Sequence, residues 1–146
     1  MDPAGLGFVQ KKPLKQARGL AGAIYRWLGI AGDKGLPPAA KLELTEEGKA
    51  KLLRYADKSE VIHVACPDFN GRRVTAEEAH GELTRAYANV LREFTRAEGR
   101  VLRLAPISGG AFAGALGGAL PALTSQALTS GWMLLDEDDV EKLKGK

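Results

Sequence analysis

A long amphipathic helix pattern between two short apolar runs constrains the fold most strongly. Thr75–Glu98 opens with the spacing of a capping box, in which a threonine is followed three residues later by Glu78. Apolar residues then recur every three or four positions along one face: Ala79, Leu83, Ala86, Tyr87, Val90, Leu91 and Phe94. The flanking runs Glu60–Ala65 and Val101–Ala105 have the length of strands, and the first has the pattern of a strand buried on both faces. The pattern predicts a βαβ unit with parallel strands, and therefore an α/β fold.

The remaining elements are shorter and their patterns are weaker. Helices are expected over Ala17–Ile30, within Leu116–Leu128, over Asp136–Lys144, and from an N-cap at Thr45. Strands are expected over Lys41–Leu44 and Trp132–Leu135, and around Phe8 and Val9. Ala50–Tyr55 is compatible with either a helix or a strand.

Length and charge limit the class of protein. The 146 residues suit one domain, and 45% hydrophobic with 27% charged residues is typical of a globular chain. A net charge of +3 suits a phosphate or polyanion ligand, and four cations crowd the N-terminal region: Lys11, Lys12, Lys15 and Arg18. A single cysteine excludes an internal disulfide and favours a reducing compartment. Without a signal-peptide pattern or an apolar run of about 18 residues, we expect a cytoplasmic or nuclear protein that is neither secreted nor membrane-bound.

Two glycine-bearing stretches indicate where a ligand would bind. In Val101–Gly118, an apolar run leads into the small-residue loop Ser108–Gly114. A loop of this kind after a strand exposes backbone N–H groups, which favour anions and phosphate above all. In Ala17–Ile30, glycines open a predicted helix, and helix N-termini also attract anions. The alternative for this second stretch is an amphipathic core helix whose small residues permit tight packing.

Other site chemistries fit the sequence poorly. The central loop lacks the Walker A lysine, because Ala115 stands there, and it lacks the middle glycine of a dinucleotide fingerprint, because Ala111 stands there. His63 and Cys66 would make only half of a metal site, so His63 is interpreted as a core histidine and no metal or cofactor is expected. No base is identified for Cys66 as a nucleophile, and Ser108 lacks the context of a hydrolase serine.

Three stretches together resemble the macro domain family. VIHVACP (Val61–Pro67) resembles a family strand, RGLAGAIY (Arg18–Tyr25) the first ligand loop and helix, and ISGGAF (Ile107–Phe112) the second ligand loop. Their order and spacing agree, and MLLDEDDVEKL resembles the last strand and helix. The resemblance implies a three-layer α/β/α fold around a central mixed, largely parallel sheet. It implies one macro-like domain over residues 1–146, in which residues 1–16 form a divergent basic segment.

The resemblance also implies a ligand and its site. Macro domains bind ADP-ribose, so this chain is expected to bind ADP-ribose, a related nucleotide diphosphate or an ADP-ribosylated protein. Backbone N–H groups of two loops would hold the diphosphate, and Phe112 would pack on a ribose. The first loop comprises Gly19, Leu20, Ala21 and Gly22, and the second comprises Ser108, Gly109, Gly110, Ala111 and Phe112. No catalytic residue is identified.

Departures from the family pattern leave two alternative functions. The family's first two strands and its adenine-reading aspartate have no match before Gln16, and Phe8–Lys11 lacks the asparagines of the family's N-A-A-N segment. One alternative is a mono-ADP-ribosyl-protein hydrolase, in which Ala21 replaces a loop aspartate common in hydrolytic members. The other is a degenerate macro fold that acts as a protein- or RNA-interaction module through its basic N-terminus. The missing strands would leave a sheet edge that a partner or a second copy could cover by self-association.

Overall fold

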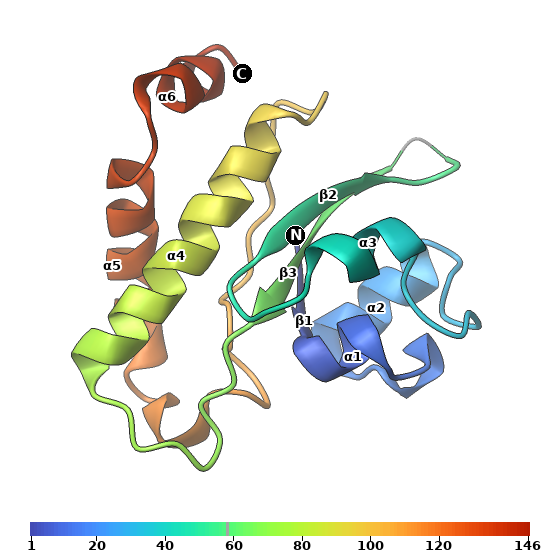
Figure 1. Cartoon of the computed structure of the whole chain (residues 1–146), viewed down its shortest axis with the longest axis horizontal. Helices are drawn as coiled ribbons and strands as arrows, with labels where there is room; N and C mark the ends of the chain where they lie inside the picture. Colours follow the sequence, from blue (N-terminus) through green and yellow to red (C-terminus); the bar gives the residue numbers. More distant parts are fainter. Residues whose placement is uncertain (58) are drawn as a thin grey trace.

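A small mixed sheet lies at the centre of the protein. The computed structural model describes residues 1–57 and 59–146. The sheet has the strand order β1-β3-β2, with β1 at Asp2–Gly5, β2 at Ala50–Arg54 and β3 at Glu60–Cys66 (Figure 1). β1 runs parallel to β3 and β2 runs antiparallel to it. The α/β class and the mixed sheet are confirmed, whereas the expected excess of parallel pairing is wrong in the described residues, where each kind occurs once.

The middle strand β3 is buried on both faces, as its apolar pattern predicts. Ile62, Val64 and Cys66 belong to one core cluster, and Ala65 belongs to a second cluster on the opposite face. The alternation follows from the two-residue period of a strand. Each face therefore needs its own cover of helices.

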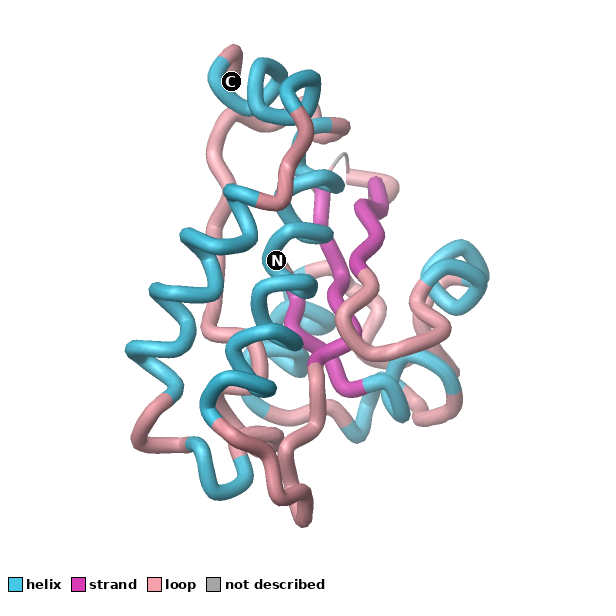
Figure 2. Tube along the Cα trace, turned by 60° about the vertical axis from the view of Figure 1, so that its left-hand side comes forward, coloured by secondary structure: helices cyan, strands magenta, loops and turns pink. Residues whose placement is uncertain are grey.

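Helices cover both faces of the sheet (Figures 1 and 2). On one face lies α4 (Ala76–Thr95), with α5 (Leu120–Met133) packed along it. The other face carries α1 (Leu6–Gln10), α2 (Gly19–Trp27) and α3 (Pro38–Glu43). The described part also contains α6 (Glu137–Lys144) and two 3-10 turns, Leu14–Gln16 and Gly114–Leu116. None of the helices in this part of the chain is both long and apolar enough to cross a membrane.

The predicted capping box at the start of α4 is confirmed. The hydroxyl of Thr75 accepts the N–H of Glu78 at 3.1 Å, and the Glu78 carboxylate accepts the N–H of Thr75 at 2.8 Å. Further along, Gly131 of α5 passes so close to α4 that a Cβ atom there would lie 3.0 Å from the backbone nitrogen of Ala88. The predicted helices over Ala17–Ile30 and Asp136–Lys144 are confirmed as α2 and α6.

The prediction of a strand at Val101–Ala105 is wrong. This segment has no helical or strand assignment, and the side chain of Val101 is 80% exposed. The parallel neighbour of β3 is β1, so the predicted βαβ unit does not close through this segment. An apolar run that buries few of its side chains gains little from joining a sheet.

Other short segments also fold differently from their predictions. Trp132 and Met133 end α5 rather than forming a strand, because α5 continues past Leu128. Lys41–Leu44 falls largely in α3, whose first turn is preset by Pro38. Phe8 and Val9 lie in α1, and no helix starts at Thr45, where the chain turns through a positive φ at Gly48 into β2. β2 resolves the ambiguity of Ala50–Tyr55 in favour of a strand.

Candidate functional site

The two glycine-bearing segments face each other across one cleft. Its volume is about 470 Å³, within the range of small-molecule sites. The predicted residues that line it are Gly19, Leu20, Ala21, Ser108, Gly109, Gly110, Ala111 and Phe112. Residues nearly ninety positions apart in the sequence are thus brought together as two walls, while the end of β1 and the start of α1 supply Pro3, Ala4, Gly5 and Phe8.

Gly22 is the one predicted site residue that does not line the cleft. It is buried on the inner side of α2, where an added Cβ atom would lie 2.5 Å from the carbonyl oxygen of Ala17. Its glycine therefore allows α2 to pack against the turn that precedes it. For this residue, the alternative interpretation of a small residue that permits tight packing is therefore confirmed.

The first wall is the N-terminus of α2. Arg18 is the N-cap residue and offers no side-chain cap, and Gly19 adopts a φ of +57°. Among the described residues, the N–H groups of Gly19, Leu20 and Ala21 donate to no protein acceptor. Unbonded N–H groups at a helix start carry partial positive charge, so this wall favours a negative ligand.

The second wall is anchored through its buried side and its carbonyl groups. Ser108 holds a φ of +59°, which is unusual for a residue with a side chain, and its hydroxyl donates to the carbonyl of Pro67 at 2.6 Å. The carbonyl of Ala111 accepts from the Asn70 side chain at 2.6 Å, and that of Phe112 accepts from the N–H of Phe69 at 3.0 Å. The surrounding structure thus holds the strained loop in place.

The same anchoring leaves N–H groups of the second wall available. In the described structure the carbonyls of Gly110, Ala111 and Phe112 accept hydrogen bonds, whereas the N–H groups of these three residues donate none. Successive N–H groups without acceptors form a concave nest that suits an anion. Both walls therefore contain backbone N–H groups that have no acceptor among the described residues.

Phe112 joins the second wall to the end of β1. Its ring lies directly over Gly5, and any Cβ atom at that position would collide with the ring. Glycine at position 5 is therefore required by this contact. The ring places a half-buried aromatic surface inside the cleft, next to the free N–H groups.

Charge in the cleft has one sign. Arg18 is the only charged side chain among its described lining residues, which contain no carboxylate or imidazole. Lys12 lies beside the cleft, with its ammonium 5.0 Å from the ring centre of Phe8. Burial raises the pKa of the Cys66 thiol to about 12, so this lining residue is neutral near pH 7 and a poor nucleophile.

His63 is a core residue, as its position on a buried strand predicts. Its Nδ1 atom lies 2.7 Å from the Asp2 carboxylate, and its Nε2 atom lies 2.7 Å from the Tyr55 hydroxyl. His63 and Cys66 are three positions apart on β3, which places their side chains on opposite faces of the sheet. They cannot share a metal ion.

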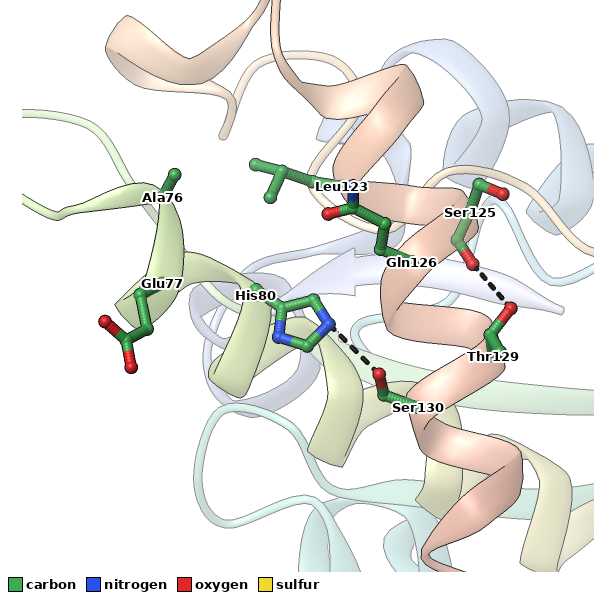
Figure 3. Close-up of a pocket in the computed structure, with 8 residues that line it drawn as sticks. All are labelled: Ala76, Glu77, His80, Leu123, Ser125, Gln126, Thr129 and Ser130. Atoms are coloured by element: carbon green, nitrogen blue, oxygen red, sulfur yellow. Dashed lines mark hydrogen bonds between the residues drawn. The ribbon is translucent and has the colours of Figure 1, made fainter.

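A second hollow is lined by residues of α4 and α5 (Figure 3). These two helices lie on the opposite side of the sheet from α2 (Figure 1). In it the Nε2 atom of His80 lies 3.1 Å from the Ser130 hydroxyl. No described side chain orients the other ring nitrogen of His80, so the pair lacks the third member that a nucleophilic serine requires. This hollow is a groove between two packed helices.

The floor of the cleft and part of its support do not follow from the sequence patterns. Pro3, Ala4 and Gly5 belong to a strand without apolar alternation, so no periodicity marks them. Asn70 belongs to none of the predicted elements, although its side chain holds the second wall.

A scan against protein-family models finds no match to the chain, and a search of curated proteins finds no relative.

Proposed function

We propose that this chain is a macro-type module, with the three-layer α/β/α fold of that family, that binds ADP-ribose. The observation that carries the proposal is the convergence of two sets of unbonded backbone N–H groups on one cleft. Gly19–Ala21 supply one set and Gly110–Phe112 supply the other. A diphosphate between the two walls would satisfy both sets of donors at once.

The rest of the cleft suits the rings of a nucleotide sugar. Phe8, Leu20 and Phe112 offer apolar surface beside the N–H groups, and Arg18 supplies positive charge at the mouth. A ligand that combines a diphosphate with ribose and base rings matches this mixture better than free phosphate does. The proposed ligand class is therefore ADP-ribose, either free or attached to a protein.

Binding is better supported than hydrolysis. Hydrolysis requires a group that positions or activates water, and such groups are usually carboxylates or histidines. Neither kind occurs among the described residues that line the cleft, and the Cys66 thiol is held neutral. We therefore expect ADP-ribosylated protein to be bound without release of ADP-ribose.

Calorimetry with ADP-ribose tests the proposal. A Cβ atom at Gly110 meets no described atom within 4 Å, so Gly110→Val should fold and fill part of the cleft. We expect saturable binding by the unmodified chain and a loss of roughly tenfold or more in Gly110→Val, which corresponds to about 1.4 kcal/mol. Gly118→Val is the matched control, because Gly118 is equally open but lies outside the cleft.

The same titration separates the alternatives. Equal affinities of both variants for ADP-ribose would place the ligand elsewhere and contradict the proposal. Absence of heat with ADP-ribose, together with RNA binding that weakens steeply with salt, would favour the RNA-interaction alternative. That alternative draws on Lys11, Lys12 and Lys15, which are exposed and form no ion pair within the described residues.

A further inference from the structure

A turn outside the ligand cleft holds the second wall. It comprises Asp68–Gly71, and none of these four described residues lines the cleft. The N–H group of Phe69 donates to the Phe112 carbonyl at 3.0 Å, and the side chain of Asn70 donates to the Ala111 carbonyl at 2.6 Å. Two successive carbonyl groups of the wall are therefore fixed by this turn.

The side chain of Asn70 is itself held in position. Its Nδ2 atom also donates to the Asp68 carboxylate at 2.9 Å, and the same carboxylate oxygen accepts the N–H group of Asn70 at 3.0 Å. The Asp68 carbonyl accepts from Arg72, whose guanidinium also donates to the Glu82 carboxylate of α4 at 3.0 Å. An amide offers two donors, so Asn70 has one for Asp68 and one for Ala111.

The hydrogen bond from Asn70 fixes one peptide plane of the wall. In a planar trans peptide, the carbonyl of one residue and the N–H group of the next point in opposite directions. Because the Ala111 carbonyl is tied to Asn70, the N–H group of Phe112 is directed away from the turn. That N–H group donates to no described acceptor, and Phe112 lines the cleft.

No second hydrogen bond restrains this peptide plane in the described structure. The Ala111 side chain is exposed, and a Cβ atom added to Gly110 would meet no described atom within 4 Å, so packing restrains the loop little on this side. If the plane rotated, the Ala111 carbonyl oxygen would take the place of the Phe112 N–H group. A carbonyl oxygen carries partial negative charge and would repel an anion that the N–H group attracts.

We propose that Asn70 is a positioning residue of the cleft, whose side chain keeps the Phe112 N–H group directed at the ligand from outside the site. This role rests on the proposed function, because the group that the N–H would meet is the diphosphate of ADP-ribose. A hydrogen bond to a charged oxygen is stronger than one to a neutral acceptor, so the loss of this one donor is large enough to measure.

Calorimetric titration with ADP-ribose compares Asn70→Ala with the unmodified chain. We expect binding to weaken about tenfold. The urea midpoint should change little, because Asn70 is exposed and its backbone N–H group still bonds to Asp68. Asn89→Ala is the matched control and should keep its affinity: the Asn89 side chain also donates to a backbone carbonyl, that of Gly48 at 2.9 Å, but it lies outside the cleft.

Nuclear magnetic resonance of the free chain tests the same role without a ligand. Asn70→Ala should make the Phe112 amide more mobile, seen as a lower order parameter or as relaxation dispersion, whereas Asn89→Ala should not. If even the unmodified chain fails to bind ADP-ribose, the proposed function fails, and a mobile Phe112 amide in Asn70→Ala alone still supports the role of Asn70. Unchanged mobility of this amide would overturn it. Equal affinities of Asn70→Ala and the unmodified chain, or equal losses in both asparagine variants, would overturn it as well.

Discussion

At the scale of single residues, the most consequential polar group is the buried Asp2 carboxylate. Asp2 and His63 are both fully buried, and the Tyr55 hydroxyl completes the network on the other ring nitrogen. Burial, reinforced by the Asp2 charge, raises the pKa values of Tyr25 and Tyr55 well above that of free tyrosine. The network ties the start of β1 to the middle of β3, and therefore supports the cleft floor that β1 supplies.

We predict that Asp2→Ala lowers the free energy of unfolding by about 3 kcal/mol. Removing one member of a buried pair leaves the other without its partner, which costs more than losing an exposed interaction. Asp2→Asn should cost less, because the amide oxygen can still accept from His63. Urea denaturation gives the comparison, with the exposed Asp33→Ala as control. A loss below about 0.5 kcal/mol in Asp2→Ala would show that the network contributes little to stability.

At the scale of elements, α4 is the best-specified part of the chain. Its N-terminus is closed by reciprocal hydrogen bonds between Thr75 and Glu78, and its apolar face packs on the sheet and on α5. The hydroxyl of Tyr87 also accepts the N–H of Ile107 at 3.0 Å, which links α4 to the start of the second cleft wall. This hydrogen bond fixes the start of the second wall to α4.

Thr75→Ala should lower the free energy of unfolding by about 1 kcal/mol, because one N–H group at the helix start loses its acceptor. Thr129→Ala serves as the control, since Thr129 is exposed within α5 and alanine is a better helix former. Thermal or urea unfolding of both variants measures the difference. Equal stabilities would mean that the capping box adds nothing to α4.

Sequence patterns predict the elements that carry two independent signals. α4 has both a helical period and a capping box, and β3 has both β-branched residues and polar or turn residues at its ends. Val101–Ala105 and Trp132–Leu135 have only a short apolar run, and Lys41–Leu44 has only four alternating residues. Patterns this short fit a helix end or a loop as well as a strand. Contacts with the rest of the fold determine the conformation of such segments, and none of these three forms a strand.

The candidate site was predictable where glycines mark the backbone. The first wall was predictable from Gly19, whose positive φ few other residues adopt. The second wall was predictable from the small residues after Ser108, which leave much of the backbone exposed. β1 was not predictable, because Asp2, Pro3 and Gly5 are poor strand formers that pair through the register with β3. A floor built by tertiary pairing leaves no local pattern in the sequence.

At the scale of the whole molecule, two clefts flank one irregular segment. Ala105, at the end of the irregular segment Val101–Ala105, and Leu20 of α2 line both the candidate ligand cleft and a second cleft of about 1,030 Å³. The two core clusters, one on each face of the sheet, pack beside these clefts.

A crystal structure of the chain soaked with ADP-ribose tests the central claim most directly. We predict density for the diphosphate between Gly19–Ala21 and Ser108–Phe112, within hydrogen-bond distance of N–H groups from both walls. Phe112 should contact a ribose ring. Density for the ligand on another surface, or an empty cleft at a saturating ADP-ribose concentration, would contradict the proposed function.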